Sequence, residues 1–416
     1  MSYQIQNLKV VNEAKAGVPI FTGVGYLDHM LDQCNSHAQV GVGLEVLFGD
    51  KTDMTDKNRL ASSNQADLCT AVGDELGKKL KEQLSYGKDA SRSRFCCPLD
   101  EALVECVISN GDGNLLEYTL PPYGIYPKGK GRSKIGGLET AAIESFWKAL
   151  ARSSNLNIRF HKVRGDNGHH IVESSFKAFS RALRNFLDKP TIWGPGSDND
   201  KASVALQRES KIERSTKETS ISVHLLLNGK SDDTQIETGI PALDEFYTIL
   251  AKEANMTLIV KCKGDLWVDD HHTAEDVSIA IGQCLSQALG TKAGLNRMWV
   301  SEAQDETAKV EVTMDLSNRP CLRHNLHDSL GLQEYVDVDA ASSSCPLSCE
   351  MMEHVLDSLV MNGRMTVHVV EKQPGATLQD TVMCTARAFG KALRVCSMVD
   401  QRRAGQTASS KGTLSV

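Results

Sequence analysis

The sequence predicts an α+β fold built from two tandem copies of one unit, and three observations support this. The segment Phe176–Arg184 (FKAFSRALR) returns as Ala386–Arg394 (ARAFGKALR) about one domain length later, and self-similarity at a fixed distance is typical of a duplication. Thr22–Asp28 (TGVGYLD) recurs as Thr238–Asp244 (TGIPALD) at roughly the same distance. Each copy also mixes helix-like with strand-like patterns. A chain of 416 residues is long enough for two such cores.

Both helix-like and strand-like patterns of apolar residues occur along the chain. After His169, apolar residues recur at helical spacing and predict a helix with one buried face. They are Val172, Phe176, Phe179, Leu183 and Phe186. Ile221–Leu227 and Met256–Val260 are short runs with β-branched residues, which predict strands.

The repeat sets the expected domain limits, with a first copy over 1–190, a linker over 191–204 and a second copy over 205–416. Trp193–Asp200 is rich in Gly, Pro and Asp, a composition that is typical of a linker. A finer repeat lies inside each copy. Segments bearing one histidine, Leu27–Leu31 and Met352–Val355, accompany segments of the form His-His-x-x-Glu. We therefore expect each copy to consist of two half-units, each a β-sheet with helices.

Composition narrows the class of protein. The chain has 46 Lys and Arg against 53 Asp and Glu, with a formal net charge of -7, so it lacks the basic excess of a nucleic-acid binder. The 12 cysteines are scattered apart from Cys96–Cys97 and include no C-x-x-C pair, which favours a reducing cytosol. Neither a signal peptide nor a membrane-spanning run is recognisable. We expect a cytoplasmic protein that acts on small molecules, without nucleic-acid or membrane partners.

Two segments carry the pattern of metal ligands, His169–Glu173 and His271–Glu275, each reading His-His-x-x-Glu. On a helix the first His and the Glu share a face while the second His is offset, so each trio can serve two neighbouring metals. A single His-His pair is more often a surface accident, but two that open apolar-periodic helices favour metal binding. The order excludes the His-Glu-x-x-His protease pattern. Imidazole and carboxylate suit Mn, Fe, Ni or Zn without choosing among them.

Three further segments have both a functional and a plain interpretation. The carboxylates of Asp265–Asp270 either hold the second nitrogen of a ligating imidazole or form a solvated turn. Arg319, in Asp315–Pro320 after a strand-like run, is well placed to grip a phosphate, although alone it is weak evidence. Ser409–Gly412 offers two hydroxyls and a cation for a phosphate, or is a frayed tail.

Taken together, these segments resemble the imidazoleglycerol-phosphate dehydratase family over nearly the whole chain, twice. The family pattern has an Asp-His-Met-Leu segment, two His-His-x-x-Glu segments, a Ser-x-Arg-Pro turn, a Glu-x-x-Glu-His helix and a Ser-Ser-Lys tail. A normal member is one copy long. The resemblance implies a ribosomal protein S5 domain 2-like fold in each half-unit, with helices packed between paired sheets. It also implies a homo-oligomer, for which a dodecamer of fused chains is one option.

Neither copy matches the family pattern completely. The first lacks the earlier His-His-x-x-Glu trio, the histidine of the Glu-His helix and the Arg-Pro turn. The residues at those positions are Ser62, Ser63, Ala66, Ser145 and Gly113–Asn114. The second copy lacks the Asp-His-Met-Leu histidine and the later trio, where it has Glu245, Gln379, Asp380 and Met383.

The losses are complementary, because each of the family's eight ligand positions survives once. The resemblance assigns two manganese ions to His29, His169, His170, Glu173, His271, His272, Glu275 and His354. Random decay of a redundant pair would more often erase both versions of at least one motif. We therefore expect one composite two-metal site per fused chain.

The resemblance also implies the chemistry, which is elimination of water from imidazole glycerol phosphate to give imidazole acetol phosphate in histidine biosynthesis. This would be a manganese-dependent hydro-lyase without an organic cofactor. Its catalytic residues would be Glu218 as the base, with the ligands His29 and His272. The substrate phosphate would be held by Arg297, Arg319, Ser409, Ser410 and Lys411. Asp357 stands where the family helix has an Arg.

Two rival hypotheses remain. The first is a catalytically dead relative that serves as a metal-stabilised scaffold or regulator. The second is a metal-dependent hydrolase, which the ligand types permit although the full motif set matches no hydrolase pattern.

Overall fold

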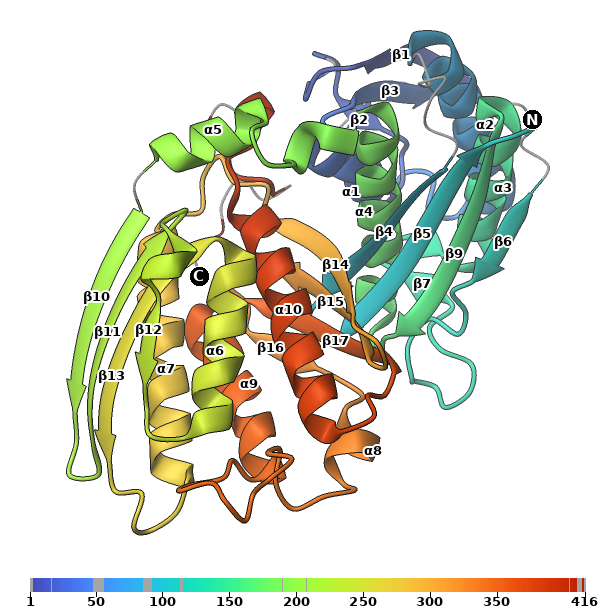
Figure 1. Cartoon of the computed structure of the whole chain (residues 1–416). Helices are drawn as coiled ribbons and strands as arrows, with labels where there is room; N and C mark the ends of the chain where they lie inside the picture. Colours follow the sequence, from blue (N-terminus) through green and yellow to red (C-terminus); the bar gives the residue numbers. More distant parts are fainter. Residues whose placement is uncertain are drawn as a thin grey trace. The chain divides into compact units, whose positions relative to one another are not determined.

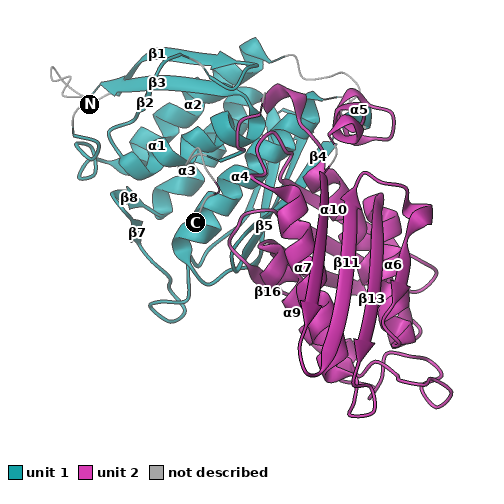
Figure 2. Ribbon diagram, turned by 90° about the vertical axis from the view of Figure 1, so that its left-hand side faces the viewer, with its two compact units in different colours: residues 1–192, 408–413 teal, residues 193–407, 414–416 magenta. Residues whose placement is uncertain are grey.

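The computed structural model describes residues 3–15, 17–47, 56–84, 92–112, 115–188, 190–206, 208–403, 405–409 and 414. The chain forms two compact units (Figure 2), one of residues 1–192 with 408–413 and one of residues 193–407 with 414–416. Each unit combines β-sheets with helices, which confirms the predicted α+β class. The segment 191–204, expected as a linker, carries most of helix α5 (Asp198–Ala205). Within the second unit, Ser203 Oγ of α5 accepts a hydrogen bond from the backbone N–H of Val399 at 2.7 Å.

Unit 1 has two principal sheets and four α-helices among its described residues. The first sheet has the order β1-β3-β2, with β1 (Gln4–Val11), β3 (Gly41–Leu47) and β2 (Ile20–Phe21). The second has the order β4-β5-β9-β6, with β4 (Arg92–Leu99), β5 (Ala102–Asn110), β9 (Leu156–Arg164) and β6 (Leu116–Thr119). The helices are α1 (Gly25–Gln33), α2 (Gln65–Gln83), α3 (Ala141–Ser154) and α4 (Gly168–Leu187). Helix α4 packs on β4 and β5, while α2 packs on α3 and β1.

Unit 2 repeats this plan with two four-stranded sheets. One has the order β10-β11-β13-β12, with β10 (Arg208–Ser215), β11 (Thr219–Leu227), β13 (Met256–Gly264) and β12 (Gln235–Glu237). The other has the order β14-β15-β17-β16, with β14 (Met298–Gln304), β15 (Lys309–Asp315), β17 (Thr366–Gln373) and β16 (Cys321–Arg323). The long helices are α6 (Pro241–Ala254), α7 (His271–Leu289), α9 (Cys349–Gly363) and α10 (Leu378–Ser397). These helices lie between the two sheets (Figure 1), as expected.

The predicted elements after His169 and in the second copy are confirmed. The apolar face Val172–Phe186 lies on α4, and its five residues are all at most 2% exposed. Ile221–Leu227 falls within β11 and Met256–Val260 begins β13. Because alternate residues of β11 are buried, this strand presents one face to the core and one to solvent.

The two copies begin their first helix in the same way. In the first, Asp28 Oδ1 accepts hydrogen bonds from Thr22 N at 2.7 Å and Thr22 Oγ1 at 2.6 Å. In the second, Asp244 Oδ1 accepts from Thr238 N at 3.0 Å and Thr238 Oγ1 at 2.6 Å. The sequence repeat therefore encodes a repeated local structure, which places position 29 and position 245 at equivalent points.

The structure corrects one part of the sequence comparison, the register of α2 against α7. A Cβ added at Gly77 of α2 would lie 2.7 Å from the carbonyl oxygen of Leu150, and one added at Gly282 of α7 would lie 2.8 Å from that of Leu359. Leu150 and Leu359 occupy equivalent places, because each precedes a left-handed helix cap by the same distance. The two glycines are thus equivalent.

When residues are counted back along α2 and α7 from these two glycines, the first-copy positions that correspond to the His-His-x-x-Glu trio of α7 change. The counterparts of His271, His272 and Glu275 are Ala66, Asp67 and Thr70, rather than Ser62, Ser63 and Ala66. Ser62 and Ser63 lie in the turn that precedes α2. The sequence comparison was wrong by one helical turn, but both registers leave the first copy without this trio.

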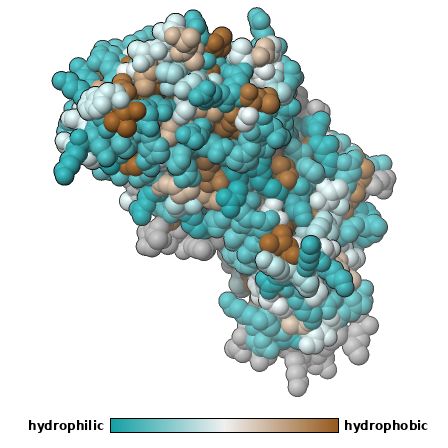
Figure 3. All heavy atoms as spheres, turned by 90° about the horizontal axis from the view of Figure 1, so that it is seen from below, coloured by the Kyte–Doolittle hydropathy of each residue, from teal (hydrophilic) through white to brown (hydrophobic). Residues whose placement is uncertain are grey.

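The surface of the described residues is largely polar. The face shown in Figure 3 is mostly hydrophilic, with hydrophobic residues scattered over it. Across the described residues, none of the helices combines the length and the apolar character needed to span a bilayer.

Candidate metal centre

The start of α4 positions the first ligand pair. Asn167 caps the helix, and its side-chain oxygen accepts the backbone N–H of His169 at 2.9 Å. A Cβ added at Gly168 would lie 2.8 Å from the carbonyl oxygen of Tyr123, so the backbone of Gly168 packs closely against the backbone of Tyr123. The hydroxyl of Tyr26 on α1 donates to the carbonyl oxygen of His169 at 3.2 Å. These contacts fix the first turn of α4 against its neighbours.

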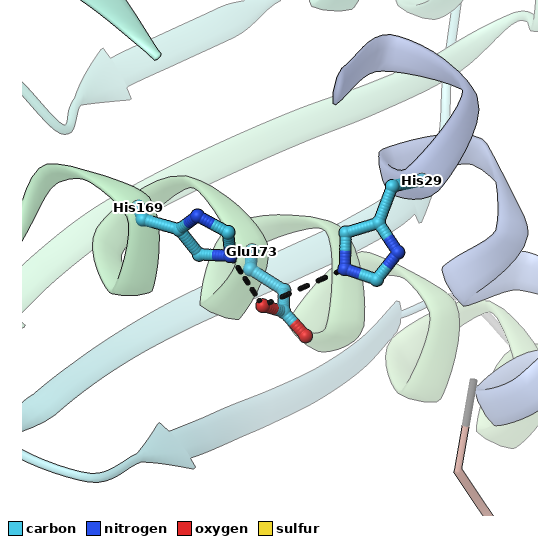
Figure 4. Close-up of side chains that lie close together, drawn as sticks. All are labelled: His29, His169 and Glu173. Atoms are coloured by element: carbon cyan, nitrogen blue, oxygen red, sulfur yellow. Dashed lines mark hydrogen bonds and ion pairs between the residues drawn. The ribbon is translucent and has the colours of Figure 1, made fainter. Parts of the chain in front are cut away.

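His29 of α1 faces His169 and Glu173 of α4 (Figure 4). Glu173 Oε2 lies 3.0 Å from His169 Nε2 and 3.8 Å from His29 Nε2. One ligand atom from each of the three residues lies within 4.8 Å of the others. Ligand atoms about 2.1 Å from one ion are roughly 3 to 3.4 Å apart, so the three groups need only small movements to hold a metal.

The electrostatics of the cluster favour an ionised carboxylate. Burial alone would raise the pKa of Glu173, but hydrogen bonds with His169 and His29 and the charge of Lys177 hold that pKa well below its usual range. The Lys177 ammonium lies 2.8 Å from Glu173 Oε1, and the two side chains are 6% and 12% exposed. A metal needs the deprotonated carboxylate, and this environment supplies it.

His170 lies beside this cluster and is held by Glu101, a residue that the sequence analysis missed. His170 Nδ1 is 2.7 Å from Glu101 Oε2, and this hydrogen bond raises the pKa of His170. Burial would raise the pKa of Glu101, but hydrogen bonds with His170 and the backbone N–H of Asn167 lower it to about 2. With Nδ1 held in this way, a metal would bind Nε2, which lies 3.8 Å from Asp100 Oδ2. No sequence pattern connects the turn that bears Glu101 with α4.

In unit 2 the second ligand set is looser than the first, because no three of its four described residues each offer a ligand atom within 4.8 Å of the others. His271 Nε2 lies 3.6 Å from Glu275 Oε2, and the ring centroids of His271 and His354 are 5.5 Å apart. Asp270, at the start of α7, accepts hydrogen bonds from the backbone N–H and the hydroxyl of Ser348, which precedes α9. The helix with His271 is thereby tied to the helix with His354.

His272 has a carboxylate near each ring nitrogen. Its Nδ1 lies 3.0 Å from Asp265 Oδ2, a hydrogen bond that raises the pKa of His272. This contact confirms that Asp265 holds an imidazole and is more than part of a solvated turn. His272 Nε2 lies 3.8 Å from Glu218 Oε1, whose side chain is 51% exposed. The structure thus places the predicted base beside a predicted ligand.

The residues that are predicted to bind the substrate phosphate differ in their burial and in their contacts. Arg297 is 3% exposed and forms a bidentate ion pair with Asp315, with its Nε 2.6 Å from Oδ1 and its Nη2 2.8 Å from Oδ2. The backbone of Arg319, just after β15, is fixed by Ser317 Oγ and Thr366 Oγ1, which donate to its carbonyl oxygen. Ser409 is half-buried. Ser410, Lys411 and the Gly113–Asn114 substitution lie outside the described residues.

The degraded positions of the second copy have a different local chemistry. Gln379 Nε2, where the first copy has His169, donates to Glu245 Oε2 at 2.8 Å, and Glu245 occupies the place of His29. Met383, in place of Glu173, is 4% exposed and belongs to the core of unit 2. An amide–carboxylate hydrogen bond and an apolar contact thus replace the ligand cluster.

Comparisons with known proteins match both copies to one family. The family model described as imidazoleglycerol-phosphate dehydratase matches residues 22–183 and 238–393, one segment in each copy. An imidazoleglycerol-phosphate dehydratase of Neisseria meningitidis serogroup C is 37% identical over 213 residues, which are 51% of this chain and 66% of that protein. The match therefore spans just under two thirds of that relative.

Two further relatives carry the same name. The chloroplastic protein of Pisum sativum is 38% identical over 208 residues, covering 50% of this chain and 69% of its own length. That of Gloeobacter violaceus is 37% identical over 201 residues, covering 48% and 95%. Among solved structures, the dehydratase of Staphylococcus aureus is 21% identical with a TM-score of 0.38, covering 46% of this chain and 99% of its own. That of Pyrococcus furiosus is 24% identical with a TM-score of 0.38, covering 49% and 99%.

Proposed function

Because this chain belongs to the imidazoleglycerol-phosphate dehydratase family, we propose that it eliminates water from imidazole glycerol phosphate to give imidazole acetol phosphate. This hydro-lyase reaction is a step of histidine biosynthesis. The observation that supports it best is complementarity, since every family ligand position is retained in one copy and lost in the other. We infer one composite site per fused chain. Its ligands come from a first-copy half and a second-copy half, taken from one chain or from neighbouring chains.

The donors suit two manganese ions. Both halves offer imidazole nitrogens together with a carboxylate, a set that accepts Mn²⁺ among other divalent ions. The first-copy half would use His29, His169, His170 and Glu173, and the second-copy half His271, His272, Glu275 and His354. Bound between these residues, the metals would supply Lewis acidity that favours the imidazolate form of the substrate ring.

The chain's own residues would perform the proton transfer and hold the substrate. A carbon-bound proton next to the ring must leave, and Glu218 is the candidate base because its carboxylate is exposed beside His272. Asp265 and Glu101 keep one nitrogen of His272 and His170 occupied and orient the other. Arg319 and Lys411, with Arg297, Ser409 and Ser410, would bind the phosphate dianion.

Exposed apolar residues beside both halves support assembly into a homo-oligomer, for which a dodecamer of fused chains remains our proposal. Trp267 and Val268 are 85% and 56% exposed just before α7. Ile125 and Tyr126 are 47% and 76% exposed, and Ile125 N donates to the carbonyl oxygen of Asp166 just before α4. Burial of these side chains in a larger assembly would surround the metal ligands with a drier environment.

One observation favours the alternative, a catalytically dead dehydratase-like protein that acts as a metal-stabilised scaffold or regulator. The Arg297 guanidinium already donates to Asp315 from Nε and Nη2, which form one of its edges. A substrate phosphate would have to compete with that carboxylate.

A steady-state assay of the manganese-loaded full chain, following imidazole acetol phosphate, separates the two functions. Turnover that a chelator removes and manganese restores would establish the lyase. Absence of turnover from folded protein that holds about two metals per chain would favour the scaffold.

A further inference from the structure

We propose that His324, His327 and Glu353 form a separate binding site for a divalent transition-metal ion in unit 2. One ligand atom from each of these residues lies within 4.8 Å of the others. In the described part of the chain, only this trio and the His29–His169–Glu173 cluster bring three potential ligands so close together. The proposal does not depend on the dehydratase function.

The fold holds the two histidines on a short, anchored segment between β16 and α9. His324 directly follows β16, and His327 begins the short helix α8 (His327–Leu330). Leu326 between them is buried, which fixes the segment to the core. The ring centroids of His324 and His327 are 4.5 Å apart. The two imidazoles are therefore presented side by side.

Hydrogen bonds to β17 fix the same segment from its other side. Asn325 exchanges two bonds with the backbone of Glu371, accepting from its N–H at 2.8 Å and donating to its carbonyl oxygen at 3.2 Å. Ser329 Oγ of α8 donates to the Glu371 carboxylate at 2.9 Å. Because the backbone is held, binding a metal would order only the side chains, which keeps the entropic cost small.

The distances fit metal entry. His327 Nδ1 lies 2.7 Å from Glu353 Oε1, whereas two ligand atoms of a tetrahedral ion at about 2.1 Å are roughly 3.4 Å apart. The two groups therefore need to separate by less than about 1 Å. Their side chains are 67% and 37% exposed, so this adjustment meets little resistance. Two imidazoles and one carboxylate select Zn²⁺, Co²⁺ or Ni²⁺ over Ca²⁺ or Mg²⁺ and leave a position for water.

The site is distinct from the dehydratase ligand set, although Glu353 and His354 are neighbours on α9. Glu353 contacts His327 of α8, while the ring of His354 lies against His271 of α7. An ordinary ion pair offers a contrast. His224 Nε2 and Glu209 Oε1 are also 2.7 Å apart, yet this pair belongs to no three-ligand group among the described residues.

Cobalt titration of the metal-stripped full chain tests the proposal. We compare the wild type with the double variant His324→Ala/His327→Ala and with His224→Ala as the matched control. Bound Co²⁺ is counted by calorimetry and by its visible absorption. The double variant should bind about one fewer Co²⁺ per chain, while His224→Ala should match the wild type. Equal stoichiometry in the wild type and the double variant would overturn the proposal, as would an equal loss in His224→Ala.

A second measurement needs no variant, so it stands even if the double substitution impairs folding. Zn²⁺ should protect His324 and His327 of the wild-type chain from modification by diethyl pyrocarbonate, as mapped by mass spectrometry. His224 should stay reactive under the same conditions. Modification of His324 and His327 at the same rate with and without Zn²⁺ would refute the site.

Discussion

Replacing Glu101 by Gln should weaken metal binding by the first-copy half. Glu101 is ionised, since its pKa is lowered to about 2, and it accepts a hydrogen bond from His170 at 2.7 Å with a side chain only 15% exposed. Glutamine keeps an oxygen for the backbone N–H groups of Asn167 and Asp166, which Glu101 accepts at 2.9 and 3.3 Å. The substitution therefore removes a charge and leaves the local fold in place.

The magnitude follows from the type of hydrogen bond. With its oxygen turned to the backbone N–H groups, the glutamine presents its NH2 group to His170 Nδ1 and cannot accept the Nδ1–H bond. The charged hydrogen bond, which contributes about 1.5–3 kcal/mol, is therefore lost. That loss corresponds to roughly 10- to 100-fold weaker binding, the range for residues that support a ligating histidine. At pH 6 the difference should shrink. Glu101 raises the pKa of His170, so the wild type must release more protons when the metal binds.

Competitive titration of Mn²⁺ against a chelator at pH 8 and pH 6 measures this change on the full chain. Asp74→Asn is the matched control, because Asp74 is a carboxylate of unit 1 that pairs with Arg152 and does not contact the cluster. Its affinity should equal that of the wild type. A change smaller than about twofold for Glu101→Gln at pH 8 would refute the supporting role of Glu101.

Three further predictions concern the composite site and the core. Alanine at any one of four ligands should abolish turnover, and full activity of any one variant would contradict the composite site; the four are His29, His170, His272 and His354. Met383→Glu should lower the free energy of unfolding by about 3 kcal/mol, because it places a carboxylate at a position that is only 4% exposed. Arg387, which stands where the first copy has Lys177, already pairs with Asp305 and does not neutralise the new carboxylate. Denaturant unfolding beside Met383→Leu, which should cost less than about 1.5 kcal/mol, checks this. Burial lowers the pKa of Lys292 from 10.5 to about 8, so the unfolded chain binds more protons between these values. The free energy of unfolding should therefore rise by up to about 3 kcal/mol across that window. Lys292→Met should remove this rise, and parallel pH profiles of the two proteins would show the reasoning to be wrong.

The sequence determined the features that rest on local spacing. The duplication, the α4 helix and strands β11 and β13 could be read from repeats and from apolar periods. The proximity of His169 to Glu173 and of His271 to Glu275 could be read as well, because a His and a Glu four residues apart share one face of a helix. These signals lie within one element, so no knowledge of packing is needed to interpret them.

Only the tertiary structure decided the features that depend on distant segments. The register of α2 against α7 is one such feature, because a slip of four residues turns a helix by only about 40° and leaves its apolar pattern nearly unchanged. The close packing of Gly77 on Leu150 removes that ambiguity. Likewise, Glu101 reaches His170, and Glu353 meets His327, from other elements of the fold. Spacing along the chain carries no record of such contacts, since they arise only when separate helices and strands pack into one core.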